Sequence, residues 1–264
     1  MAVVRLRASL RDKVWGRRKL SPWFPDAAEP VGEAWFLADG EELPLLVKLL
    51  FTSDRLSVQV HPDDGEDGPR GKTEMWHILE AAPDATIALG FRERISRERL
   101  GEAVRTGEVE ELLNWVPVRA GQTFFTPAHT VHAIGAGIVL CEIQQNSDVT
   151  YRLWDYGRPR ELHVEQALRV SDLGVHGGAV TGREIAPGVE ELVRCRFFET
   201  DLVTLEAGES RAVEARTCHL WICIEGRGEI DGQQFVAGEV WWIQGSGTVR
   251  ADVPSRFLRC FVPR

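Results

Sequence analysis

Cysteine is scarce in this chain of 264 residues, and its pattern excludes several kinds of site. The number of cysteines is odd and no C-x-x-C pair occurs, which argues against a disulfide framework and against a thiolate metal site. Most of them lie in apolar stretches that are typical of strands, so we expect buried free thiols. No catalytic motif surrounds any of the five, which are Cys141, Cys195, Cys218, Cys223 and Cys260.

Long apolar runs are lacking as well. No hydrophobic stretch approaches the ~20 residues of a membrane-spanning helix, and residues 1–5 do not resemble the start of a secretory signal peptide. Basic residues are outnumbered, since 31 Lys and Arg stand against 40 Asp and Glu and give a formal net charge of −9. Such a surface repels a phosphate backbone. We therefore expect a cytoplasmic protein with no membrane and no nucleic-acid partner, in which an anionic substrate needs a local cationic pocket.

The residues that are present describe an ordinary globular protein, with 44% hydrophobic and 27% charged residues. The length suffices for one large domain or two smaller ones. Most segments are typical of short strands, but the apolar residues of 96–115 recur at helical spacing. Gly107 divides this stretch into two short helices, and Ser96 and Thr106 are their expected N-caps. We assign no catalytic residue to this helical segment.

A glycine-rich stretch at residues 173–188 predicts a linker. It separates a larger domain, residues 1–172, from a smaller one, residues 189–264. Strands are expected in the smaller domain at residues 197–205, 219–224, 238–243 and 257–262.

Turn and core residues also mark the smaller domain. Gly226-x-Gly228 and Asp231-Gly232 predict hairpin turns. Trp241 and Trp242 are expected to pack in the core rather than to form a sugar platform. His219 has no second ligand near it in the sequence, so we expect no metal in this domain.

One stretch, residues 56–74, carries residues suited to a metal site. Leu56, Val58 and Val60 alternate with polar residues, which indicates a strand whose polar face presents Gln59 and His61 together. Glu74 follows a loop, and His132 closes a second segment that begins at Gly121. A single histidine of this kind is more often structural than a ligand, but two imidazoles and a carboxylate together suit a divalent metal.

The spacing of these residues resembles the two sequence motifs of the cupin family. His61 is followed by Glu74 thirteen residues later, and the second segment has the pattern Gly121-x5-Pro127-x4-His132. Longer blocks between residues 10 and 165 resemble type I phosphomannose isomerases. These blocks are LSVQVHPDD, GKTEMW, PAHTVHAIGAG and EIQQNSDVTYRLWDYGRPRELH.

This resemblance implies a mainly β fold. It consists of a cupin, or jelly-roll, β-barrel with a short helical insertion, followed by a smaller degenerate cupin-like β module. The implied activity is the interconversion of mannose 6-phosphate and fructose 6-phosphate through an enediolate, with one Zn²⁺ per chain. The implied partner is a sugar phosphate, and we expect a monomer or a weak homodimer.

The resemblance also implies roles for individual residues. His61, Glu74 and His132 would hold the zinc, with Gln59 as a fourth and weaker ligand. Glu142 would transfer the proton, while Lys72 and Arg152 would be catalytic and would bind the substrate. From the residues alone, Glu142 and Arg152 could instead form an ion pair at the rim of the barrel.

The sequence departs from the family pattern at one position and leaves two other functions open. His129 stands where the family usually has glycine, so it either adopts a less strained backbone or carries the cost of a positive φ. Its side chain could reach towards the metal or the substrate, but we expect a displaced side chain that does not bind the metal. Two histidines and a carboxylate also form the metal triad of non-haem iron oxygenases. A sugar-binding cupin without catalysis is the third reading, although Lys72, Glu142 and Arg152 together favour an enzyme.

Overall fold

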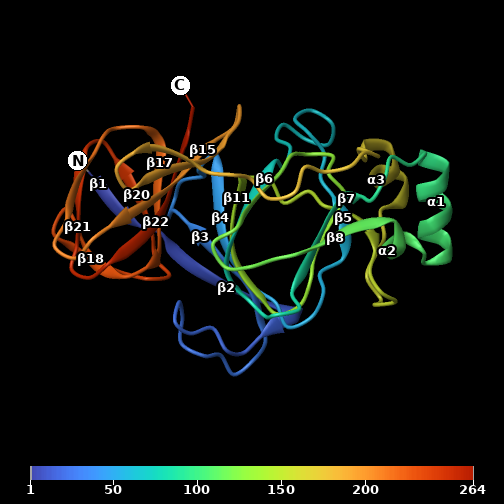
Figure 1. The fold of residues 1–264 in the computed structure, drawn as a ribbon, viewed down its shortest axis with the longest axis horizontal. Helices are drawn as coiled ribbons and strands as arrows, with labels where there is room; N and C mark the ends of the chain where they lie inside the picture. Colours follow the sequence, from blue (N-terminus) through green and yellow to red (C-terminus); the bar gives the residue numbers. More distant parts are fainter. Residues whose placement is uncertain (1, 264) are drawn as a thin grey trace.

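Two barrels of antiparallel strands make up most of the molecule, as the computed structural model of residues 2–263 shows (Figure 1). The mainly β fold expected from the sequence is confirmed. The first barrel consists of two sheets that face each other. In sheet order, the six-stranded sheet contains β2 (Arg7–Arg17), β3 (Val31–Leu37), β4 (Leu45–Phe51), β11 (Ile138–Gln145), β6 (Glu74–Ala81) and β9 (Thr123–Thr126). The five-stranded sheet contains β12 (Tyr151–Trp154), β5 (Val58–Val60), β10 (His132–Ile134), β7 (Thr86–Phe91) and β8 (Leu113–Pro117).

Strand β11 shows how the sequence builds the first barrel. Every residue of this strand is buried, so both faces of the sheet are covered. Leu140 packs with the interior of the first barrel, whereas Val139 and Cys141 belong to the core on the other side of the sheet. Because side chains alternate along a strand, Glu142 points to the same interior as Leu140.

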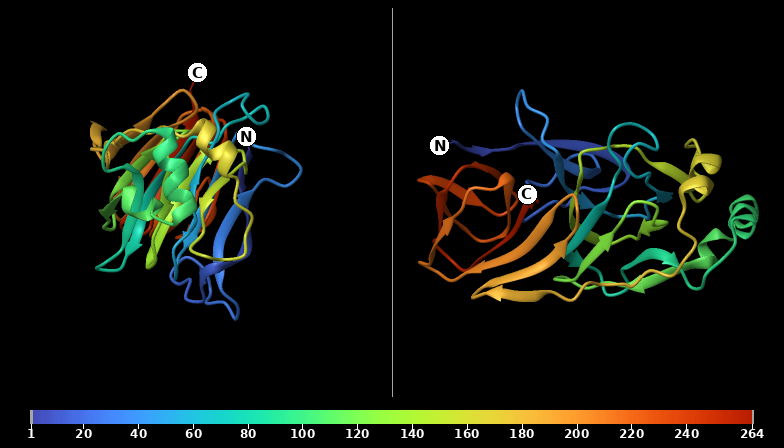
Figure 2. Two further views of the ribbon diagram at one scale, coloured as in Figure 1. Left: turned by 90° about the vertical axis from the view of Figure 1, so that its right-hand side faces the viewer. Right: turned by 90° about the horizontal axis from the view of Figure 1, so that it is seen from above.

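Three short helices cover the outer face of the five-stranded sheet at one end of the molecule (Figure 2, left). They are α1 (Arg97–Thr106), α2 (Val109–Leu112) and α3 (Val164–Val170). Leu100 and Val104 of α1 pack against Val58 and Val60 of the sheet in one apolar cluster. No helix among residues 2–263 has the length and apolar character needed to cross a membrane.

The predicted helix ends are partly correct. Ser96 caps α1 as expected, because its side chain accepts a hydrogen bond from the Arg99 amide. Thr106 is not an N-cap; it is the last residue of α1, and Gly107 ends the helix with a φ of 85°. The second helix is shorter than predicted, because residues 113–117 pair with β7 as strand β8.

The second barrel lies beside the six-stranded sheet and also has two sheets (Figure 2, right). Its larger sheet contains, in order, β1 (Ala2–Arg5), β20 (Val240–Gln244), β17 (Thr217–Glu225), β22 (Ser255–Val262), β15 (Glu199–Leu205), β14 (Val189–Arg194) and β13 (Arg183–Ala186). Its smaller sheet contains β16 (Ser210–Val213), β21 (Gly247–Ala251), β18 (Arg227–Ile230) and β19 (Gln233–Val236).

One of the two predicted hairpin turns in this barrel is confirmed. Asp231 and Gly232, with φ of 46° and 79°, join the paired strands β18 and β19. The hairpin at Gly226 is wrong, because β17 and β18 belong to different sheets. Gly226 has a φ of 97° and lets the chain pass from one sheet to the other. Trp241 is buried in the core of this barrel, as expected.

The two barrels share an apolar core. Val139 and Cys141 of the first barrel pack in the same cluster as Leu220, Leu258 and Cys260 of the second. The first strand crosses this division, since β1 pairs with β20 rather than with β2.

The predicted linker contains strand β13, so it is less irregular than expected. The domain limits themselves stay a prediction. All five cysteines are free, and four of them are buried.

Candidate metal and substrate site

Three residues from separate segments meet at the ends of strands in the first barrel. His61 directly follows β5, Glu74 begins β6 and His132 begins β10. One ligand atom from each lies within 4.8 Å of the other two, and all three residues are buried. Glu74 Oε1 lies 3.5 Å from His132 Nε2, and Glu74 Oε2 lies 3.7 Å from His61 Nε2. The sequence therefore grouped these three residues correctly.

The protonation of the two imidazoles follows from their hydrogen bonds. His61 Nδ1 lies 2.9 Å from the Val149 carbonyl oxygen, and His132 Nδ1 lies 2.8 Å from that of Thr130. A carbonyl oxygen only accepts, so each Nδ1 carries the proton and each Nε2 presents a lone pair. Burial lowers the pKa of His132 to about 3 and holds the pKa of His61 well below its ordinary value. Both rings are therefore neutral, as a metal ligand must be.

The carboxylate of Glu74 completes a donor set that fits a divalent cation. Within residues 2–263, neither oxygen accepts a well-directed hydrogen bond, although both are buried. Lys72 Nζ lies 2.7 Å from Oε2 and 3.0 Å from His61 Nε2, so a positive charge already sits among the donor atoms. Burial raises the pKa of Glu74, and a cation at this point would reverse that shift.

Gln59 lies next to the three ligands. It pairs with His132 across β5 and β10, and its Nε2 lies 3.2 Å from His132 Nε2. The carboxamide would offer its oxygen to a cation after a half-turn about its last bond. Its place in the structure is thus compatible with the weak fourth ligand implied by the sequence.

His129 has a left-handed backbone with a φ of 74°, so of the two possibilities left open by the sequence it carries the strain that glycine would avoid. Its Nε2 lies 2.7 Å from Glu66 Oε2, and the side chain is outside the group of three ligands. Its backbone N–H donates to the His61 carbonyl at 2.8 Å. The turn at His129 therefore supports the backbone of a ligand while its side chain contacts the loop that joins His61 to Glu74.

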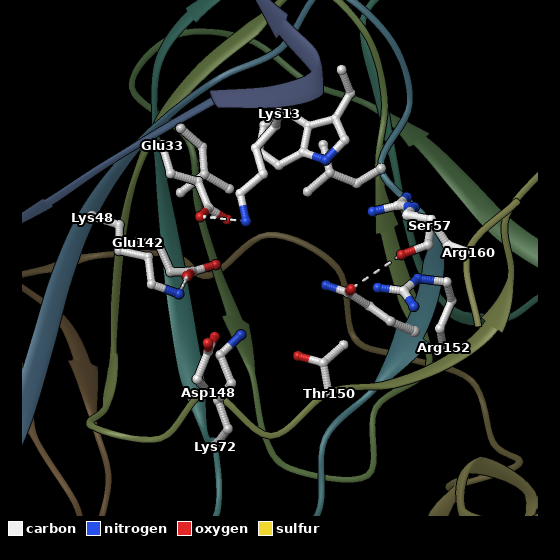
Figure 3. A pocket seen from close by; sticks show the side chains of 14 residues that line it. Lys13, Glu33, Lys48, Ser57, Lys72, Glu142, Asp148, Thr150, Arg152 and Arg160 are labelled. Carbon is white, nitrogen blue, oxygen red and sulfur yellow. Dashed lines mark hydrogen bonds and ion pairs between the residues drawn. The ribbon is translucent and has the colours of Figure 1, made fainter. Parts of the chain in front are cut away.

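A polar cavity of 280 Å³ adjoins the ligands, between the two sheets of the first barrel (Figure 3). The six-stranded sheet contributes Lys48 and Glu142, which face each other directly across β4 and β11. Lys48 Nζ lies 3.0 Å from Glu142 Oε1, and Trp76 Nε1 donates to Glu142 Oε2 at 3.1 Å. Lys13 and Glu33 form a further pair of 3.0 Å at the edge of the cavity.

Ion pairs inside the cavity decide whether Glu142 and Lys72 are charged. Burial alone would raise the pKa of Glu142, but Lys48 and Lys72 and the hydrogen bonds from Lys48 and Trp76 lower it. Burial alone would lower the pKa of Lys72, but the carboxylates of Glu74 and Glu142 raise it. Glu142 is therefore an anion and Lys72 a cation at neutral pH.

Arg152 lies on the five-stranded sheet, next to Gln59 across β12 and β5. The ion pair with Glu142 that the residues alone allowed is absent among the described residues, because Glu142 pairs with Lys48. Arg152 Nη1 donates instead to the Glu161 carbonyl oxygen at 2.7 Å, and its buried Nε has no partner among residues 2–263. Arg160 lines the same part of the cavity (Figure 3).

Sequence reasoning missed several residues of this cavity. Lys48 is the one charged residue of LLVKLLF, a strand buried on both faces, and that contrast was a usable signal. Arg160, Lys13 and Glu33 carried no comparable signal, since surface arginines, lysines and glutamates are common.

Comparisons with known proteins agree with this geometry. The chain is 34% identical over 240 residues to the mannose-6-phosphate isomerase of Streptococcus mutans, covering 73% of this chain and 76% of that protein. It is 36% identical over 216 residues to mannose-6-phosphate isomerase ManA of Bacillus subtilis, covering 75% of this chain and 67% of that protein. No protein-family model matches the chain.

Solved structures show the same fold. The mannose 6-phosphate isomerase from Bacillus subtilis superimposes with a TM-score of 0.87 at 24% identity, over 99% of this chain and 100% of that one. A variant of the phosphomannose isomerase from Salmonella typhimurium gives 0.81 at 16% identity, with 100% of both chains covered. By its sequence similarity and its fold, the chain belongs to the mannose-6-phosphate isomerase family.

Proposed function

We propose that this chain interconverts mannose 6-phosphate and fructose 6-phosphate and holds one zinc ion at His61, Glu74 and His132, with Gln59 as a fourth ligand. One observation carries the proposal: two neutral imidazole lone pairs and a buried carboxylate converge beside a cavity rich in cations. Neutral imidazoles with one carboxylate suit zinc. When bound, the ion supplies Lewis-acid stabilisation of developing negative charge, which is worth several kcal/mol.

The reaction needs a group that moves a proton between C1 and C2 of the open-chain sugar. Glu142 is our candidate, because it is ionised, lies inside the cavity and keeps its place through Lys48 and Trp76. It would take the C2 proton of the aldose and return it to C1, while the proton of the O2 hydroxyl passes to O1, so that the carbonyl moves from C1 to C2. Lys72 is the buried cation nearest the ligands and would offset the charge of the enediolate oxygens.

The phosphate of the substrate needs cations that are not already neutralised. Lys13, Lys48 and Lys72 each pair with a carboxylate, namely Glu33, Glu142 and Glu74. Arg152 has no such partner among the described residues, and Arg160, which lines the cavity with it, shares the one carboxylate of Asp155 with Arg158. We therefore assign the phosphate to the end of the cavity formed by Arg152 and Arg160. A guanidinium suits this task because it offers paired N–H donors in a fixed plane.

Activity on mannose 6-phosphate, before and after removal of the metal, tests this proposal. We expect formation of fructose 6-phosphate, loss of that activity with a chelator and recovery with one equivalent of zinc. Recovery with iron(II) accompanied by oxygen consumption would support the oxygenase reading instead. Binding of mannose 6-phosphate without turnover, at full zinc content, would support a non-catalytic sugar-binding protein.

A further inference from the structure

Asp155 is a buried carboxylate that accepts hydrogen bonds from two arginines. Its side chain is 2% exposed. Arg160 donates to it from Nε and from Nη2, each at 2.6 Å. Arg158 donates to it from Nε at 3.1 Å and from Nη2 at 2.8 Å. One carboxylate therefore fixes the orientation of two guanidinium groups on the loop that follows β12.

The two arginines extend to different places. Arg160 lines the cavity next to Arg152 (Figure 3). Arg158 is not among the residues that line the cavity; it donates to the Arg55 carbonyl oxygen at 2.8 Å and lies 3.5 Å from Asp54 Oδ2. The chain thus offers a matched pair of arginines that share one acceptor and differ in whether they reach the site.

Arg160 needs an anchor because it lies close to another cation. Burial lowers the pKa of Arg152, and the charge of Arg160 lowers it further, whereas Asp155 raises it. Without the carboxylate, the two guanidinium groups repel each other in a partly buried space. With Asp155 in place, Arg160 donates from Nε and Nη2 to its carboxylate, while Nη1 makes no hydrogen bond to the described part of the chain.

We propose that Asp155 is a positioning residue that holds Arg160 beside Arg152, so that both can bind the phosphate of the substrate. This inference rests on the proposed function and adds the residue that organises phosphate recognition. A preoriented guanidinium binds an anion more tightly than a mobile one because less side-chain entropy is lost on binding. The effect falls on substrate binding rather than on proton transfer, which takes place at the other end of the sugar.

The matched variants Arg160→Gln and Arg158→Gln test the proposal in the zinc-loaded protein. The measurements are kcat and KM for mannose 6-phosphate and the inhibition constant of inorganic phosphate. For Arg160→Gln we expect KM and the inhibition constant to rise about tenfold or more, the order expected for lost charge-assisted hydrogen bonds, with kcat within about threefold. For Arg158→Gln we expect both constants to stay within about twofold of the parent.

Asp155→Asn tests the anchor itself. We expect it to raise the same two constants as Arg160→Gln, and we expect the double variant to be no worse than Arg160→Gln alone. A purely structural role would instead lower kcat and the unfolding midpoint without the specific loss of phosphate inhibition. If Asp155→Asn does not fold, Arg160→Lys takes its place, because lysine keeps the positive charge but lacks the paired N–H donors of the guanidinium. A parental KM in Arg160→Lys would overturn the proposal.

Failure of this inference is distinguishable from failure of the proposed function. An unmodified protein that turns over mannose 6-phosphate, with equal KM values in Arg160→Gln and Arg158→Gln, would refute the role of Asp155 and Arg160 alone. An unmodified protein without turnover at full zinc content would refute the proposed activity. In that case no inhibition constant can be measured, so the affinity for inorganic phosphate is measured directly. An affinity in Arg160→Gln equal to that of the parent would overturn the inference too.

Discussion

Lys48 and Glu142 stand opposite each other on β4 and β11, and their side chains form a buried ion pair of 3.0 Å inside the barrel. Neither partner is more than 5% exposed. The pair keeps the pKa of Glu142 low against the effect of burial, together with Lys72 and Trp76. The residue that we propose for proton transfer thus stays ionised in a place where an isolated carboxyl group would hold its proton.

Replacing Lys48 by methionine should therefore leave a buried carboxylate without its ion-pair partner, held only by the Trp76 hydrogen bond and the more distant charge of Lys72. We expect a loss of about 3–5 kcal/mol in the free energy of unfolding at pH 7, as is usual when one partner of a buried pair is removed. The deficit should shrink as the pH falls, because the pKa of Glu142 rises in the variant and protonation then removes the buried charge. Denaturant unfolding at pH 7 and pH 5, in the presence of a chelator, measures this. Lys48→Met combined with Glu142→Gln should recover much of the loss, and an equal loss in both variants would contradict the account.

Arg152→Ala should separate metal binding from turnover. Arg152 is not one of the proposed ligands, so zinc content should stay at one per chain. The value of kcat/KM should fall a hundredfold or more, because the variant loses the guanidinium that we assign to the phosphate and its charge-assisted hydrogen bonds. Elemental analysis and a coupled assay on the same sample measure both quantities. Near-parental kcat/KM would remove Arg152 from the mechanism.

His61→Ala should abolish both zinc binding and activity. The imidazole contributes one of the converging lone pairs, and its loss leaves too few protein ligands for a stable site. His77→Ala is a suitable control, because His77 is an equally buried histidine that bonds to Thr123 rather than to the ligands. Full zinc content in His61→Ala would show that His61 is not a ligand.

Gly226→Ala should cost much more stability than Gly232→Ala. Both glycines have a positive φ, so both substitutions strain the backbone by about 1 kcal/mol. At Gly226 an added Cβ would also clash with Ser255 Oγ and lie 2.7 Å from Ser255 Cα, whereas at Gly232 it would meet open space. We expect an additional 1–3 kcal/mol, roughly the cost of overpacking, at Gly226 only. Equal unfolding midpoints for the two variants would contradict the close approach of β17 and β22 there.

His219 should make the second barrel sensitive to acid. Its Nδ1 lies 3.1 Å from the Glu214 carbonyl oxygen, and its Nε2 accepts the Trp221 indole N–H at 3.0 Å, so the ring is neutral. Burial lowers its pKa to about 4. The unfolded chain therefore binds more protons than the folded one between about pH 6.5 and pH 4, and stability falls as the pH drops through that window. His219→Gln keeps an acceptor for Trp221 without titrating, so its unfolding free energy should depend less steeply on pH; an unchanged slope would contradict this.

The sequence predicted the convergence of His61, Glu74 and His132 better than the charged lining of the cavity. His61 and Gln59 share a strand face, and Glu74 and His132 stand at motif spacing, so local pattern and family resemblance pointed to the same group. Lys48, by contrast, reaches the site through the pairing of β4 with β11, which joins residues 94 positions apart. Arg160 reaches the cavity from the loop after β12, where Asp155 accepts its hydrogen bonds. Such placements follow from tertiary pairing, which no local pattern encodes.

The errors in secondary structure have a similar origin. Gly226 has the composition of a hairpin turn, but the strands on either side of it pair in different sheets. Residues 113–115 continue a helical pattern and nevertheless pair with β7 as part of strand β8. Tertiary pairing overrides propensity at these two places. Thr106 is a local error, because Gly107 ends α1 directly after it. The N-cap at Ser96 and the turn at Asp231-Gly232 were predictable because their geometry is set by the residues themselves.

The core shared by the two barrels limits how the protein can be taken apart. Strand β11 carries Glu142 on one face, while Cys141 and Ile143 on the other face pack with the second barrel. A fragment ending near residue 172 would present that apolar face to water and would be prone to aggregate, whatever its metal content. Efforts to transplant the candidate site onto a smaller scaffold must therefore redesign the outer face of β4, β6 and β11 as well as retain the side chains of the cavity.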